Sequence, residues 1–195
     1  MTQAIIDNAA AISLDGELTL STSVSNARNL QFFRQGPVQF VAEVQLNVLT
    51  ADQYEPIRGA VSNGLLGPYN LQFPEEVAGT PSIHTVTVDG ANQSGSVVNI
   101  SSVSTNVRVF RAGQLVQFPG TSEVHIATSD AVTNGIGNGV VNLNYPLSAV
   151  TTDGATILSG NDCVFSMYLI NRGRASFGPT GLVNHDGPFQ FVENL

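Results

Sequence analysis

The chain has 195 residues, of which 42% are hydrophobic, so it can build a core in one large β domain or in two small ones. Its seven basic residues are all arginines, scattered between Arg28 and Arg174, against fifteen acidic residues and a formal net charge of −8. This pattern excludes the basic stripe by which proteins bind nucleic acid. No apolar run is long enough to span a membrane, and no basic segment leads into an apolar one at the start, so we expect a soluble chain without a secretion signal.

The surface predicted from this composition is polar but largely uncharged. Charged residues make up only 11% of the chain, less than half of the roughly 25% found in ordinary soluble domains, whereas Ser, Thr, Asn and Gln together number 60. Hydroxyl and amide groups are more readily paired again than charges when a partner protein covers them. The composition therefore favours a component of a protein assembly.

Two strands are predicted near the start of the chain by alternating apolar residues. Residues 17–24 alternate with Leu18, Leu20 and Val24 inward, and a turn at Gly36 separates them from a longer run over residues 38–48. An antiparallel sheet with one face in contact with water follows from this alternation. The inward positions of the longer strand are Val38, Phe40, Ala42, Val44, Leu46 and Val48.

One helix is predicted, over residues 53–63. Asp52 and Glu55 have the spacing of a capping box, and apolar residues recur at helical spacing. Gly64 and Gly67 end the helix, and residues 69–73 resume a short strand. The apolar positions of the helix are Tyr54, Ile57, Val61 and Leu65.

From about residue 79 the sequence changes to short β runs divided by Gly, Asn and Asp, which is typical of a small barrel or sandwich. Longer apolar strands return at 164–170 and 188–192. We therefore predict a mainly β fold in which residues 1–79 and 162–195 form an antiparallel sandwich or barrel domain with one short helix, and residues 80–161 form an inserted β domain. The short runs are 83–88, 97–100, 107–110, 115–118, 124–127 and 140–143.

The three histidines and the single cysteine do not form a recognisable reactive site. His84 and His125 fall in predicted strands, where polar faces are expected, and His185 precedes an Asp-Gly turn and is assigned to a hairpin tip. None has a second ligand at a metal-binding spacing. Cys163 enters an apolar strand, so we expect a buried, unreactive thiol.

Other reactive patterns are also weak. The glycine-rich residues 135–139 lack the Lys-Ser/Thr of a phosphate loop and are predicted to form a hairpin loop. Glu75 and Glu76 would point to opposite faces of a strand, and Asp130 has no acidic residue close to it in sequence. We therefore assign no catalytic, metal or cofactor-binding residue and expect a protein that is not an enzyme.

Several segments are similar to segments of bacteriophage minor tail and distal-tail-like proteins. Residues 42–69 resemble the strand, short helix and Gly-x-Tyr/Phe exit of that family, and residues 79–81 with 88–95 resemble the start of its inserted β domain. The family's pattern of turn and core residues is matched by residues 109–118, 123–127, 137–143 and 146–147. Gln114 stands where the family usually has aspartate, and His125 stands where it usually has tyrosine.

This resemblance implies a structural subunit of the virion, at the distal end of the tail tube or in the baseplate. Such a subunit would be present in the host cytoplasm during assembly, form a homo-oligomeric ring and contact tail-tube, baseplate or tip proteins. Two alternatives remain at this stage: an accessory module that binds a host glycan or protein, and a head-tail connector subunit. Candidate contact residues are Gln39, Gln45, Asn47 and the tail after Val192.

Overall fold

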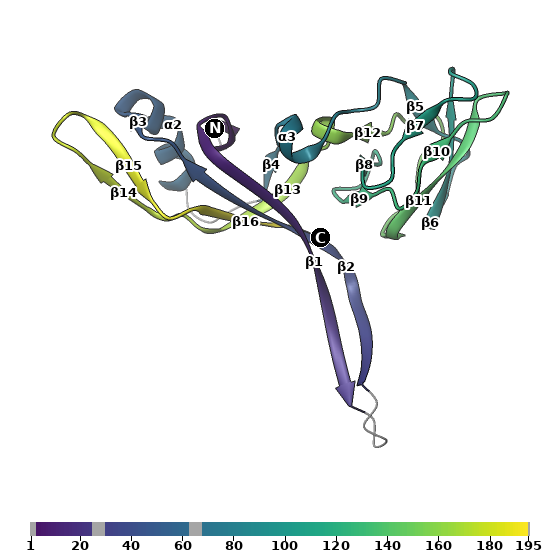
Figure 1. The fold of residues 1–195 in the computed structure, drawn as a ribbon, viewed down its shortest axis with the longest axis horizontal. Coiled ribbons are helices and arrows are strands. Elements are labelled where there is room, and N and C mark those ends of the chain that lie inside the picture. The colour runs from purple at the N-terminus through teal and green to yellow at the C-terminus, as the bar shows by residue number, and fades with distance from the viewer. Residues whose placement is uncertain (1–2, 25–29, 63–67, 195) are drawn as a thin grey trace.

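A computed structural model gives the structure of the chain; it describes residues 3–24, 30–62 and 68–194, with side chains for 3–16, 39–59 and 68–194. The described residues form mainly β structure in antiparallel sheets, which confirms the predicted fold class (Figure 1). No helix in the described ranges has the length and apolar character needed to cross a bilayer.

The main sheet brings the two ends of the chain together. Its five strands lie in the order β1-β2-β16-β13-β4, so both late strands are between β2 and β4. The strands after residue 162 therefore complete the N-terminal sheet, as the sequence predicts. The bounds are β1 (Ala9–Val24), β2 (Leu30–Leu46), β4 (Tyr69–Leu71), β13 (Phe165–Asn171) and β16 (Phe189–Glu193).

Strands β1 and β2 form a long ribbon that projects away from the rest of the molecule (Figure 1). They pair with each other from Ala9↔Leu46 outward to Val24↔Leu30, with a shift in register between Leu18 and Leu20. β16 pairs with β2 only from Val41 to Val44. Beyond that point, each described ribbon strand has only the other strand as its partner.

The core of the main sheet follows the predicted alternation closely. Phe40, Ala42, Val44 and Leu46 are all buried, whereas Val48 is 59% exposed. The prediction for Val48 is wrong because β2 ends at Leu46 and the short strand β3 (Leu49–Thr50) pairs in a different sheet. The side chains of Leu18, Leu20, Val24 and Val38 lie outside the described residues.

The predicted helix is α2 (Ala51–Ser62), and it begins with a different cap from the one proposed. Gln53 Oε1 accepts the Thr50 backbone N–H at 3.0 Å, and Thr50 Oγ1 accepts the Gln53 N–H at 3.4 Å. This reciprocal pair has the capping-box geometry that was assigned to Asp52 and Glu55. Tyr54 and Ile57 are buried as expected.

Some predicted helix residues lie outside the described residues, and the structure has further helices that the sequence does not predict. The side chain of Val61 is outside them, as are Leu65, Gly64 and Gly67. Two further short helices, α1 (Gln3–Asp7) and α3 (Glu75–Ala78), and the 3-10 turn η1 (Gly160–Asp162) are present where the sequence predicts no helix. Glu75 and Glu76 are consequently helical, not on a strand.

The middle of the chain forms small sheets around a second core. The strand orders are β11-β6-β5, β12-β8-β9 and β10-β7. Val98, Ile100 and Val141 are fully buried in this core, and Leu115 and Val124 belong to the main-sheet core, so the two cores adjoin. The bounds are β5 (Val86–Val88), β6 (Gly95–Ser102), β7 (Arg108–Phe110), β8 (Leu115–Gln117), β9 (Val124–Ile126), β10 (Ala131–Val132), β11 (Asn138–Leu147) and β12 (Leu158–Ser159).

A third group of strands, β14 (Arg174–Phe177), β15 (Leu182–Asp186) and β3, lies beside α2 (Figure 1). The hairpin turn between β14 and β15 covers residues 178–181. His185 is therefore inside a strand, not at a hairpin tip, and its ring stacks on Phe189 at a centroid distance of 4.4 Å. The prediction for His185 is wrong because the Asp-Gly turn joins β15 to β16 in a different sheet.

Truncation of Phe165 should strongly destabilise the fold. Its side chain is fully buried. The ring makes edge-on contacts with the rings of Phe40 and Phe73, at centroid distances of 5.3 Å and 5.2 Å. We expect Phe165→Ala to lower the free energy of unfolding by about 3–5 kcal/mol, because it leaves a cavity among three strands. Urea denaturation measures this loss.

The matched control is Val103→Ala, at a side chain that is 93% exposed. Its free energy of unfolding should stay within about 0.5 kcal/mol of the unaltered chain. Equal, small losses in both variants would contradict the assignment of Phe165 to the core.

Candidate functional site

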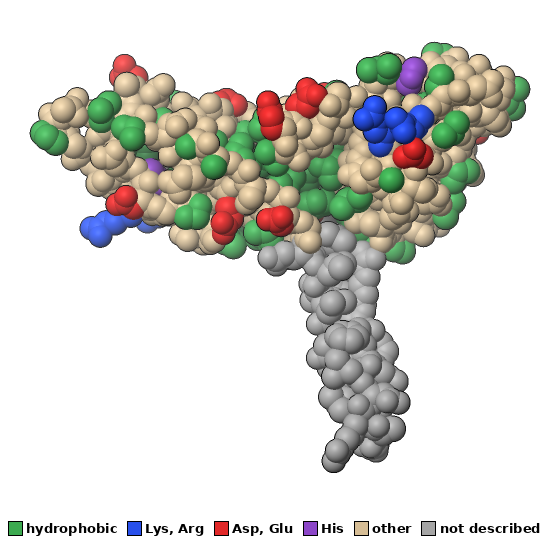
Figure 2. All heavy atoms as spheres, in the orientation of Figure 1, with side chains coloured by type: hydrophobic (Ala, Val, Ile, Leu, Met, Phe, Trp, Pro, Cys, Tyr) green, Lys and Arg blue, Asp and Glu red, His purple; other side chains and the backbone are tan. Residues whose placement is uncertain are grey.

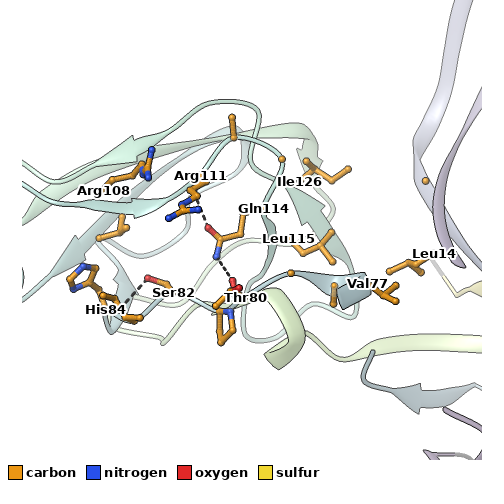
Figure 3. Close-up of a pocket in the computed structure, with 18 of the residues that line it drawn as sticks. Leu14, Val77, Thr80, Ser82, His84, Arg108, Arg111, Gln114, Leu115 and Ile126 are labelled. Atoms are coloured by element: carbon orange, nitrogen blue, oxygen red, sulfur yellow. Dashed lines mark hydrogen bonds between the residues drawn. The ribbon is translucent and has the colours of Figure 1, made fainter. Parts of the chain in front are cut away.

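A groove of about 790 Å³ lies between the main sheet and the middle unit (Figure 3). One wall comes from the base of the ribbon, a second from the segment that leaves α3, and a third from β7, β8 and the loop between them. Figure 2 shows apolar side chains in the hollow between the two parts of the body, with a basic patch nearby. The lining residues used below are Leu14, Gly16, Phe40, Val77, Thr80, Ser82, Ile83, His84, Arg108, Arg111, Gln114, Leu115 and Ile126.

The end of the groove next to the ribbon is apolar. Leu14 of β1 and Val77 of α3 lie close together there, and Leu115 and Ile126 face them from the middle unit (Figure 3). These side chains pack against the core of the main sheet. The groove is therefore formed where the two cores meet.

The other end of the groove carries two arginines. Arg108 Nη1 lies 3.0 Å from Asp130 Oδ2, and both side chains are 46% exposed. Asp130 also accepts the Ala112 backbone N–H at 2.9 Å, and this bond, followed by the Arg108 contact, lowers the pKa of the carboxyl. Arg111 forms no salt bridge with a described side chain, although its charge also helps to lower the pKa of Asp130.

Gln114 connects two walls of the groove. Its Oε1 accepts the Arg111 backbone N–H at 2.9 Å, and its Nε2 donates to the Thr80 carbonyl at 3.0 Å. Aspartate, which the resembling family usually has here, would supply no donor for the Thr80 carbonyl. The amide thus suits its position better than a carboxylate.

The ribbon presents an open backbone edge to the groove. Phe40 N–H donates to Glu193 Oε2 on the β16 side of β2, so it points away from β1. Gly16 is opposite Phe40 in the register, and Leu14 is opposite Ala42. Because peptide groups alternate sides along an antiparallel strand, the N–H and C=O groups of Gly16 and Leu14 point away from β2.

A buried carboxylate joins the two parts of the body. Glu193 is 1% exposed; its Oε2 accepts the Phe40 N–H at 3.1 Å and its Oε1 accepts the Val124 N–H at 3.3 Å. Phe40 belongs to the main sheet and Val124 to β9. Burial, opposed by these two hydrogen bonds, raises the pKa of Glu193 to about 7, and the nearby charge of Glu123 acts in the same direction as burial.

His125, which follows Val124 in β9, lies in an aromatic environment. Its ring is fully buried, 4.2 Å from Tyr145 and 6.0 Å from Phe118 between centroids, and its Nε2 lies 3.6 Å from Glu123 Oε2. Burial lowers the pKa of His125 to about 4, against a smaller opposite effect of the Tyr145 backbone. The prediction that His125 is on a polar strand face is wrong because both faces of β9 are covered by the two cores.

The other residues considered in the sequence analysis lie in separate parts of the structure. His84 is in a bend, not in a strand, and lines the groove. Cys163 is fully buried, as predicted, and burial, with the charge of Asp162, raises the pKa of its thiol to about 12. Residues 135–137 form a turn, as predicted for this glycine-rich segment, whereas residues 138 and 139 already belong to β11.

The candidate contact residues are partly used inside the chain. Gln39 Nε2 donates to the Glu193 carbonyl at 2.8 Å, and Gln45 Nε2 donates to the His185 carbonyl at 3.3 Å. Asn47 is exposed, and its Nδ2 donates to the Ala9 carbonyl at 3.2 Å. The segment after Val192 begins with buried Glu193, so it is not a free tail at that position.

Sequence reasoning missed the acidic pair Glu123 and Glu193, since 70 positions separate them and only the tertiary fold brings them together. It also missed the arginine end of the groove, where Arg108 and Arg111 were considered only as scattered charges. Within the described ranges, no set of three or more His, Cys, Asp and Glu side chains is arranged to hold a metal ion.

Comparison with known proteins adds no family to this description. No protein-family model matches the chain, and no curated protein matches its sequence.

Glu193 and His125 should make opposite contributions to the pH dependence of stability. The raised pKa of Glu193 makes the fold less stable as pH rises from about 4.5 to about 7, and the lowered pKa of His125 makes it less stable as pH falls from about 6.5 to about 4. Over the shared range the two slopes cancel in the unaltered chain.

Single substitutions should reveal how each of these two groups changes the free energy of unfolding with pH. Relative to the unaltered chain, Glu193→Gln should lose stability on acidification below about pH 6.5, and His125→Phe should lose it as pH rises above about 4.5, each by up to about 1.4 kcal/mol per pH unit. Urea denaturation at several pH values measures both differences. Parallel profiles for all three proteins would contradict the assignment.

Proposed function

We propose that this chain is a structural subunit of a bacteriophage tail, near the distal end of the tube or in the baseplate, that assembles into a ring with copies of itself. The observation that carries the proposal is the projecting β1–β2 ribbon (Figure 1). A two-stranded ribbon is marginally stable by itself in water, so a long one is normally covered by another part of the assembly.

The sequence of the ribbon supports an intermolecular contact. Its backbone register pairs Leu18 with Val38, Thr22 with Phe32 and Val24 with Leu30. Five of these six positions are apolar, whereas the intervening pair, Leu20 with Arg34, includes one charged residue. A ribbon with many apolar residues gains free energy when a neighbour removes them from water.

The composition of the remaining surface agrees with this role. With 11% charged residues and many amides and hydroxyls, the surface can be covered by a neighbour at a small desolvation cost. Of the segments that resemble distal-tail-like proteins, the described part of residues 42–69 includes α2, and residues 109–118, 123–127, 137–143 and 146–147 lie in the middle unit between β7 and β11. The tail location rests on that resemblance, and the assembly role rests on the ribbon.

Removal of the outer ribbon should abolish assembly and leave the body folded. In the test variant, residues 18–38 are replaced by Asn-Gly, which closes a two-residue hairpin on the Glu17↔Gln39 pair. We expect the intact chain to form closed rings and the shortened chain to be monomeric, as measured by light scattering and negative-stain microscopy. Circular dichroism should show the same β content per residue in the body.

A matched control shortens a hairpin elsewhere. Replacing residues 179–181, in the turn between β14 and β15, by Asn-Gly leaves the ribbon intact and should leave assembly unchanged. An intact chain that stays monomeric at every concentration, or a shortened chain that still forms rings, would contradict the proposed function.

A further inference from the structure

The groove has the features of a site for an extended polypeptide. One wall is the free edge of β1, where the peptide groups of Leu14 and Gly16 point away from β2. No described residue forms a backbone hydrogen bond with this edge at those two positions. An added strand could pair with the edge, since main-chain hydrogen bonds are the basis of binding by strand addition.

The walls next to this edge suit alternating side chains. Side chains of an added strand would point in turn toward and away from the apolar end formed by Val77, Leu115 and Ile126. Ile83 also lines the groove and is 89% exposed. A bound segment would cover this isoleucine, which the chain itself leaves in water.

The end of the groove farther from the ribbon is positively charged. Arg111 and Arg108 lie there with His84 (Figure 3), and Arg111 forms no salt bridge with a described carboxylate, although its charge acts on Asp130. The chain has only seven basic residues and a net charge of −8, so two arginines on one groove are a local exception. An acidic group beyond the paired residues of a bound strand would meet this positive end.

We propose that the groove binds an extended segment of a neighbouring protein, which adds as a strand to β1 at Leu14 and Gly16 and places a carboxylate at Arg111. The identification of the source as another tail protein rests on the proposed function. The strand addition itself rests on the open edge, the apolar walls and the charge of the groove.

Binding of short synthetic peptides tests this inference. The probes are fluorescein-labelled octapeptides in which valine and threonine alternate over six residues and two glutamates follow or precede them. Fluorescence anisotropy of the unaltered chain should show saturable binding of one of these two peptides. N-methylation of alternate backbone amides, or replacement of both glutamates by lysine, should weaken binding at least tenfold.

Two protein variants locate the site. Arg111→Gln should weaken binding of the glutamate peptide about fivefold or more, because one charged contact is lost. Arg172→Gln removes an exposed arginine at the far end of β13 and should leave the affinity unchanged. Equal circular dichroism and thermal midpoints for both variants exclude unfolding as the cause.

The outcomes separate this inference from the proposed function. No binding of either peptide up to about 1 mM, or equal binding of the N-methylated peptide, would overturn strand addition in the groove. The ribbon-shortened chain retains Leu14 and Gly16 and should bind the peptide as a monomer. Peptide binding by a chain that never forms rings would therefore contradict the assembly role alone.

Discussion

A buried carboxylate is one of the contacts that join the two halves of this protein. Glu193 accepts hydrogen bonds from Phe40 in the main sheet and from Val124 in β9, while its solvent exposure is 1%. A buried acidic group is costly unless it is hydrogen-bonded or protonated, and here both compensations are present near neutral pH. The groove lies between the same two units, and the hydrogen bond from Gln114 to the Thr80 carbonyl also joins its walls.

The same arrangement explains why the ribbon can serve as a contact element. Its base is held on one side by β16, whose last residue is Glu193, and β1 keeps its other edge free. The fold thus supports one long hairpin at its base and leaves two kinds of surface for partners, the outer ribbon and the open edge in the groove. Both are backbone features of a chain whose surface carries few charges.

The sequence predicts the elements of this fold better than their connections. Alternation identified the buried positions Phe40 to Leu46 because one face of β2 is fully covered, and it failed at Val48 because a change of sheet leaves no mark on the local pattern. The return of the last strands to the N-terminal sheet was predictable because a small sheet needs edge partners. The buried polar groups beside the groove were not, since Glu193, Glu123 and His125 are ordinary residues in sequence and become unusual only through burial in the fold.

The central claim is that the ribbon is a contact between subunits. Hydrogen–deuterium exchange, followed by mass spectrometry at low and high protein concentration, measures the protection of its backbone amides directly. The account predicts that peptides covering residues 17–24 and 30–38 exchange much more slowly in the assembled protein than in the monomer, whereas β13 changes little. Equal exchange of the ribbon in monomer and assembly would contradict it.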